Sequence, residues 1–116
     1  MLREGLLLGS VSVQTWIIQG NVAEHDELMV HWLNHVRRRF PVTGMRYFRP
    51  PLGPVLMRSW AVTLEGREAL RCYLGFLRED EDSLRYRSRW LELMQHSSYS
   101  VSVQHELDLS GLDQPV

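Results

Sequence analysis

The sequence predicts an α+β domain in which helices cover one face of a four-stranded antiparallel sheet. Segments near both ends alternate between apolar and polar residues, as strands do. Two longer segments carry apolar residues at helical spacing. Two further strand-like segments lie between the helical ones, separated by prolines and a glycine that favour a turn. The resulting order, β-α-β-β-α-β, is ferredoxin-like.

The size and charge of the chain limit its class. With 116 residues, we expect a single domain over residues 1–116, with a core over about residues 10–108. The chain is 44% hydrophobic and 23% charged, as in ordinary globular proteins. Its 13 basic and 14 acidic residues give a net charge of −1, which favours neither nucleic acid nor an anionic membrane as a partner.

Targeting and redox signals are weak. No apolar run is long enough to cross a bilayer, and the residues after Leu6–Leu8 are too polar for the core of a signal peptide. The single cysteine, Cys72, excludes an intramolecular disulfide and a multi-cysteine zinc site. We therefore interpret the protein as cytoplasmic and expect no membrane contact.

The first strand is expected over Ser10–Gln19 and is followed by a helix that ends at Phe40. Asn21 and Glu24 have the spacing of a capping box, which predicts a side-chain hydrogen bond at the helix start. Three arginines suit the negative end of this helix, and Pro41 stops it.

The middle of the chain predicts a strand pair and a second helical region. Met45–Arg49 and Val55–Leu64 read as strands joined by a proline-rich turn. The second helix starts near Arg67, and Asp82 or Ser83 could cap its continuation. The helical region is therefore either split or extended.

The last strand is expected in "SYSVSVQHELDL", residues 98–109, because the apolar residues alternate again. His105 falls on the same face as Val101 and Val103, which favours a histidine at the edge of the core. His96 is expected in the loop before this strand, where it could reach the mouth of a cavity. The final "SGLDQPV" is expected to be frayed.

One sheet face of this fold has no helices to cover it. The strand Val55–Leu64 carries apolar residues on both faces, and exposed apolar surface usually marks an interface or a ligand site. We expect a second copy to cover that face, so that two sheets enclose a cavity. Which face of this strand points inward stays open, because a slip of one residue exchanges the faces. The candidate ligand-binding residues are Gln14, Trp16, Arg58, Trp60 and Gln104.

Three stretches resemble a known family. The segments "VQTWII", "GPVLMRSWAVTLEGREAL" and "SRWLEL", in this order, resemble the NIPSNAP-like branch of the dimeric α/β-barrel superfamily. The resemblance covers about residues 10–108 and implies a dimeric α/β barrel, hence a homodimer. The triplet Gln14-Thr15-Trp16 departs from the family pattern, which usually has Arg and Tyr there.

The histidines of the first helix offer a metal site as one interpretation. His31 and His35 are four residues apart, as zinc ligands on a helix are, but no third ligand accompanies them. A solvated helix face is the better interpretation, and we expect no metal. His25 is expected to be a half-buried contact rather than a base.

Arg58 is the most unusual polar residue, because an unpaired arginine in a central strand would be costly. It is expected to form a structural ion pair with a carboxylate, across the dimer or at a strand end, or to hold a ligand anion. Cys72 is expected to be a small packing residue rather than a nucleophile.

Three functions remain open at this point. The first is a non-catalytic protein that holds a small, partly apolar or anionic ligand between sheet and helices, with no cofactor. The second is a cofactor-independent or haem-degrading monooxygenase, since relatives in the superfamily do such chemistry; residues 67–95 contain no histidine to bind haem. The third is a purely structural dimer with no pocket.

Overall fold

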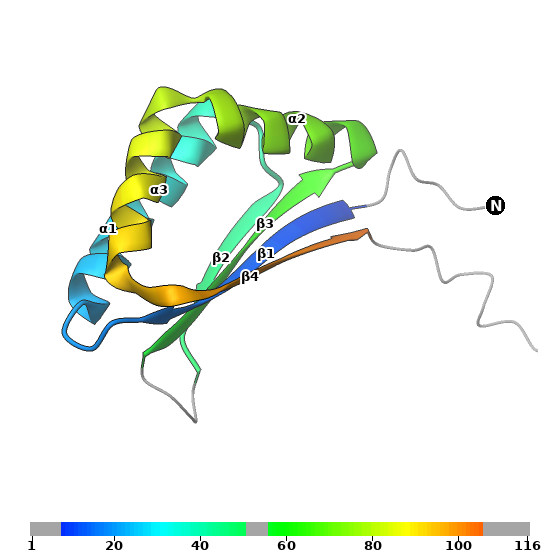
Figure 1. Cartoon of the computed structure of the whole chain (residues 1–116). Helices are drawn as coiled ribbons and strands as arrows, with labels where there is room; N and C mark the ends of the chain where they lie inside the picture. The colour runs from blue at the N-terminus through cyan, green and yellow to red at the C-terminus, as the bar shows by residue number, and fades with distance from the viewer. Residues whose placement is uncertain (1–7, 51–55, 106–116) are drawn as a thin grey trace, which may run out of the picture.

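Four antiparallel strands form one curled sheet, and three helices lie on one side of it (Figure 1). The structure is a computed structural model that describes residues 8–50 and 56–105. The strand order is β2-β3-β1-β4, which confirms the predicted ferredoxin-like α+β fold. The elements are β1 (Leu8–Ile17), α1 (Val22–Arg39), β2 (Gly44–Phe48), β3 (Met57–Glu65), α2 (Arg67–Glu79), α3 (Glu81–Leu93) and β4 (Met94–His105).

The pairing of β1 with β3 decides which residues face the helices. Val13 lies opposite Trp60 and Thr15 opposite Arg58, so these side chains share one face. Trp60 and Arg58 are buried there. Ser12 lies opposite Ala61 on β3, and both belong to the other face. The question left open by the sequence is therefore answered: Arg58 and Trp60 point toward the helices.

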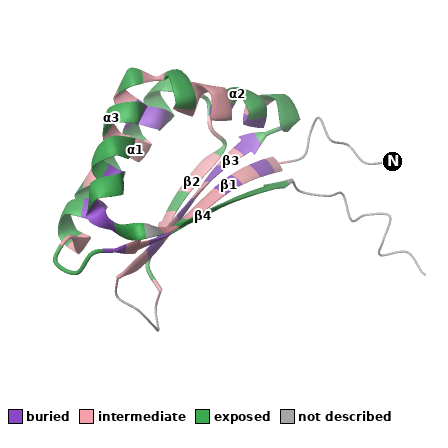
Figure 2. Ribbon diagram, in the orientation of Figure 1, coloured by how far each residue is buried: buried purple, intermediate pink, exposed green. Residues whose placement is uncertain are grey.

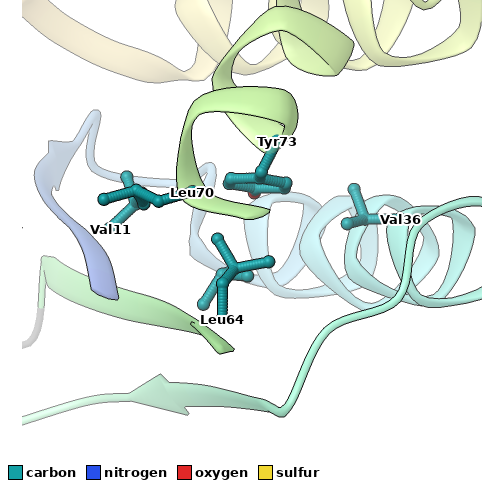
Figure 3. Close-up of a cluster of buried hydrophobic side chains, with 6 residues drawn as sticks. Val11, Val36, Leu64, Leu70 and Tyr73 are labelled. Atoms are coloured by element: carbon teal, nitrogen blue, oxygen red, sulfur yellow. The ribbon is translucent and has the colours of Figure 1, made fainter. Parts of the chain in front are cut away.

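Helix α2 closes one end of the core. Leu70 and Tyr73 of α2 point toward Val11 and Leu64 of the sheet (Figure 3), and Val62 of β3 and Val36 of α1 complete the cluster. A second buried cluster lies between α1, α3 and the sheet, and it is built from Met29, Trp60, Trp90 and Met94. Burial of these large side chains supplies the main stabilising free energy of the fold.

The helix caps differ from the sequence prediction. Asn21 is the N-cap of α1, but its side chain makes no capping hydrogen bond, so the predicted capping box is wrong. Glu24 lies in the first turn of α1, but its side chain pairs with Arg89 of α3, and the Asn21 backbone N–H donates to Ile18 O instead. The helical region after β3 is split at Asp80, whose Oδ2 accepts a hydrogen bond from Ser83 N at 2.9 Å. The cap is thus Asp80, not Asp82 or Ser83.

Strand β4 is an edge strand with little cover. It is exposed from Tyr99 to Gln104 (Figure 2). It starts at Met94, so His96 lies in the strand rather than in a preceding loop, and its side chain is exposed. The pairing with β1 shifts register between Thr15 and Ile17, where β4 takes up the extra residues of a bulge. The tail predicted to be frayed and most of the predicted turn lie outside the described residues.

None of the helices in the described ranges is long and apolar enough to span a membrane.

Candidate ligand cavity between sheet and helices

A cavity of about 690 Å³ lies between the sheet and the helices. This volume falls within the range of small-molecule sites, which are concave and mostly apolar. Both buried clusters contribute to its lining, Val36 and Tyr73 from the first and Trp60 and Trp90 from the second. Its mouth lies between the edge strand and the helices α2 and α3, because Tyr99 and Val101 of β4 and Arg78 and Arg87 of the helices line it and are exposed.

Aromatic rings dominate one wall of the cavity. Trp90 of α3 packs edge-on against Trp60 of β3, with ring centroids 5.3 Å apart. The same ring lies 5.3 Å from Tyr99 of β4 and 6.1 Å from Trp32 of α1. Edge-to-face pairs of this kind suit the ring quadrupoles. The wall therefore offers large, polarisable surface to a flat ligand.

The two cationic side chains in the lining are Arg78 of α2 and Arg87 of α3. Both are exposed. Arg78 Nε donates a long hydrogen bond of 3.4 Å to Leu74 O, and Arg87 has no ion pair within the described residues. Both guanidinium groups can therefore meet an anionic group of a ligand at the rim.

A chain of hydrogen-bonded polar groups, buried at His25 and Arg58 and half-buried at Tyr47 and Asp26, lies behind the aromatic wall. Trp90 Nε1 donates to His25 Nε2 at 3.1 Å, and His25 Nδ1 lies 2.8 Å from Tyr47 Oη. Tyr47 Oη donates to Asp26 Oδ1 at 2.5 Å. Arg58 closes the chain with two hydrogen bonds to the Asp26 carboxylate, from Nε at 2.9 Å and from a second guanidinium nitrogen at 3.2 Å.

The bonds at both ends fix the protonation of the histidine in this chain. Trp90 Nε1 can only donate, so His25 Nε2 accepts. Tyr47 gives its proton to Asp26, so Tyr47 Oη accepts from His25 Nδ1. His25 is therefore the neutral tautomer with its proton on Nδ1.

The electrostatics of the chain agree with this assignment. Burial lowers the pKa of His25 to about 4, against an opposing effect of Asp26 and with a smaller contribution from Arg58. For Asp26, burial acts to raise the pKa, but hydrogen bonds from Arg58 and Tyr47 outweigh it and lower the pKa. Burial and the bond to Asp26 raise the pKa of Tyr47. At neutral pH the chain holds one ion pair and two neutral groups.

The five predicted ligand-binding residues are not brought together. Trp60 lines this cavity, which lies on the helix side of the sheet and not between two sheets, where the five candidates were expected to meet. Arg58 lies on the same face of the sheet, but it does not line the cavity. Its guanidinium group is instead held in an ion pair by Asp26 of α1. Arg58 thus forms a structural ion pair, but its partner lies on α1 of the same chain and not across a dimer.

The other three candidates lie on the opposite face. Gln14 and Trp16 line a separate, shallow hollow of about 240 Å³ next to Ser98 and Ser100. Gln14 Nε2 lies 2.8 Å from Met57 Sδ. Gln104 is exposed opposite Ser10 and lines neither hollow.

Three side-chain predictions are corrected. His25 is fully buried rather than half-buried. His35 is buried and bonded to Asp80 Oδ2 at 2.7 Å, so the α1 face that carries it is not solvated. Cys72 is exposed on α2 and does not pack in the core.

The remaining histidines give no metal site among the described residues. His31 is exposed, 4.0 Å from Glu27, and its partner in the predicted spacing is taken by Asp80. The described ranges hold no group of three or more His, Cys, Asp or Glu side chains that could bind a metal ion. The His105 side chain lies outside the described residues.

Sequence reasoning missed Asp26 and Tyr47. Asp26 lies in the acidic segment that begins the first helix, where the helix dipole alone explains a carboxylate, so the sequence pattern does not indicate its contact with the sheet. One signal could have found it: a buried arginine on a central strand needs a carboxylate, and the helix that crosses this strand supplies three.

Comparison with known proteins identifies the fold. No protein-family model matches the chain, and no curated protein sequence matches it. Solved structures do match. SnoaB, a cofactor-independent oxygenase from Streptomyces nogalater, aligns with a TM-score of 0.68 at 10% identity, over 84% of this chain and 90% of its own. An antibiotic biosynthesis monooxygenase aligns with a TM-score of 0.69 at 13% identity, over 86% and 99%.

A protein from Shewanella oneidensis aligns with a TM-score of 0.72 at 9% identity, over 92% of this chain and 96% of its own. At these identities the likeness establishes the fold, and the chemistry must be argued from the site.

Proposed function

We propose that this protein binds a flat, apolar molecule with an anionic group in its cavity and oxygenates it with O2 without a cofactor. The observation that carries the proposal is the cavity of about 690 Å³, walled by Trp60, Trp90 and Tyr99 and rimmed by Arg78 and Arg87. The rings bind the flat apolar body. The guanidinium groups bind a phenolate or carboxylate at the mouth.

The structural likeness to a cofactor-independent oxygenase and to an antibiotic biosynthesis monooxygenase supports this chemistry. The reduction of O2 to one carbonyl oxygen and one water takes two electron pairs. A substrate with a CH2 group activated by a neighbouring phenol supplies both of them itself. The CH2 group loses its two hydrogens and gains one oxygen atom of O2 as a carbonyl, and the second oxygen atom leaves as water. An arginine beside the phenol favours its ionised form and hence electron transfer to O2.

Binding without catalysis is the second candidate, and the composition of the lining favours it. The described residues that line the cavity include no histidine, cysteine or carboxylate, so no side chain in that lining is a general base at neutral pH. The same lining offers no histidine to haem iron. An oxygenase of this kind therefore depends on the substrate's own ionisation.

We also propose that two copies associate through the uncovered sheet face. This face carries Trp16, Met57 and Ala61, all partly exposed, and no helix of the described residues lies over it. The purely structural dimer gains no support from a cavity of this volume, which holds far more than one water molecule. The NIPSNAP-like resemblance stays a prediction.

Oxygen uptake with 1,8-dihydroxyanthrone, a flat phenol with an activated CH2 group, tests the proposal. We expect the protein to accelerate uptake over the spontaneous reaction by about tenfold or more, and R78Q/R87Q to remove about tenfold of that acceleration. The matched control is R37Q/R38Q, which removes two exposed arginines of α1 outside the cavity.

Two results would decide against the oxygenase. Saturable quenching of tryptophan emission without faster uptake selects the binding protein. If the dihydroxyanthrone causes no faster oxygen uptake, and neither it nor 8-anilinonaphthalene-1-sulfonate quenches tryptophan emission, the cavity is not a site for aromatic anions.

A further inference from the structure

We propose that His25, Tyr47, Asp26 and Arg58 form a positioning chain that sets the orientation of Trp90 in the cavity wall. The inference rests on the proposed binding of an aromatic ligand in the cavity. The four residues do not line the cavity, so they would act on a ligand through Trp90 alone.

Trp90 is the point where the aromatic wall is joined. Its ring contacts Trp60, Tyr99 and Trp32, which come from three different elements. Any rotation of Trp90 therefore changes the wall that a flat ligand meets. The single polar atom of this ring, Nε1, is bonded to His25.

Each hydrogen bond of the chain depends on the direction of the next one, so the loss of one bond changes the others. His25 can accept from Trp90 only while its own proton stays on Nδ1, and Tyr47 Oη holds that proton there. Tyr47 Oη accepts from His25 because its own proton is directed to Asp26. Each bond thus orients the next one.

The far end of the chain is fixed to the sheet. Arg58 holds both Asp26 oxygens, and its Nη1 also donates to Met57 O at 3.0 Å. Arg58 belongs to β3, the same strand that carries Trp60. The chain therefore ties one aromatic residue of the wall to the strand that supplies another.

Tyr47→Phe tests the chain, because it removes one hydroxyl and keeps the ring. Without that hydroxyl, the His25 proton is free to move to Nε2, and that tautomer cannot accept from Trp90. The matched control is Tyr86→Phe, whose ring stacks on Trp32 but whose hydroxyl lies outside the chain.

The readouts are the indole N–H resonance of Trp90, assigned with Trp90→Phe, and the Kd of 8-anilinonaphthalene-1-sulfonate. We expect Tyr47→Phe to speed hydrogen exchange of the Trp90 indole about tenfold and to weaken the Kd about fivefold. Tyr86→Phe should change both by less than about twofold. His25→Gln can still accept from Trp90 and donate to Tyr47, so we expect it to keep Kd within about threefold of the wild type, whereas His25→Leu should not.

Equal effects of Tyr47→Phe and Tyr86→Phe on Kd would overturn the proposal, since the hydroxyl would then matter only for general stability. If Tyr47→Phe does not fold, the nitrogen resonances of wild-type His25 decide. An unprotonated Nε2 at neutral pH supports the chain, and a protonated Nε2 overturns it. The indole and histidine resonances are measured on the free protein, so they remain informative even if the sulfonate does not bind.

Discussion

The ion pair between Asp26 and Arg58 is asymmetric, and this asymmetry decides what each residue contributes. The Arg58 side chain is 6% exposed, whereas the Asp26 side chain is 41% exposed. Loss of the arginine leaves a carboxylate that water can still reach. Loss of the carboxylate removes the charge that Asp26 places beside a buried cation, which is the costlier defect.

We therefore expect Asp26→Asn to lower the free energy of unfolding by about 3 kcal/mol. Glu27→Gln, which removes the next, exposed carboxylate of the same helix, should change it by less than about 0.5 kcal/mol. Urea unfolding at one fixed protein concentration measures both, because association would otherwise shift the apparent stability. If both variants lost the same unfolding free energy, Asp26 would not be needed to balance the charge of Arg58.

At the scale of elements, the junction of α2 and α3 is held by one carboxylate. Asp80 accepts from the backbone N–H of Ser83 and from His35 of α1, so it caps α3 and fastens two helices to each other. Burial acts to raise the pKa of Asp80, but the bonds from His35 and Ser83 prevail and lower the pKa. The capped form is therefore the ionised one.

We expect Asp80→Ala to cost about 1 kcal/mol of unfolding free energy at neutral pH, as the loss of an N-cap does. Because the native pKa lies below the unfolded one, this contribution is complete above the ordinary carboxyl range. It disappears as the pH falls through the lowered native value. Urea unfolding at several pH values should show the wild type and Asp80→Ala converging in acid. Glu81→Ala, an exposed carboxylate one residue on, is the control, and a gap that stays constant down to acid pH would contradict the assignment.

At the scale of the whole molecule, the two faces of the sheet differ in composition and in what covers them. One face carries the core, the cavity and the polar chain. The other has small residues such as Ser12 and Ala61 at its centre and larger ones, Trp16 and Phe48, toward its margins. A flat centre of small side chains lets a second sheet approach closely.

We expect the protein to sediment as a dimer at micromolar concentration. Ala61→Arg, which places an unpaired charge at the centre of the uncovered face, should weaken the association at least about 100-fold. Ser88→Arg adds the same charge on the exposed side of α3 and should leave the dimer intact. A wild-type monomer at this concentration would rule out the proposed association.

The sequence predicts the order of elements and most of their bounds, because periodicity depends only on neighbouring residues. It does not predict the site, because the site depends on pairing register. A shift of one residue in β3 would exchange Arg58 and Trp60 for Met57 and Ser59 at the helix side. The bond from His35 to Asp80 spans 45 positions and has no local signature, so the sequence pattern around His31 and His35 predicts a solvated helix face.

The tryptophans lie on both sides of the sheet, so their fluorescence reports on two separate places in the molecule. Three of the four indoles, in Trp32, Trp60 and Trp90, line the cavity, and Trp90 lies close enough to the other two, at 5.3 and 6.1 Å, for their excited states to couple. The fourth, Trp16, lies on the opposite side of the sheet, beside the shallow hollow. Changes in emission from the coupled indoles thus report on occupancy of the interior. The emission of Trp16 responds to whatever covers the uncovered face of the sheet. Tryptophan fluorescence of one unlabelled sample therefore distinguishes ligand binding in the cavity from association of two copies.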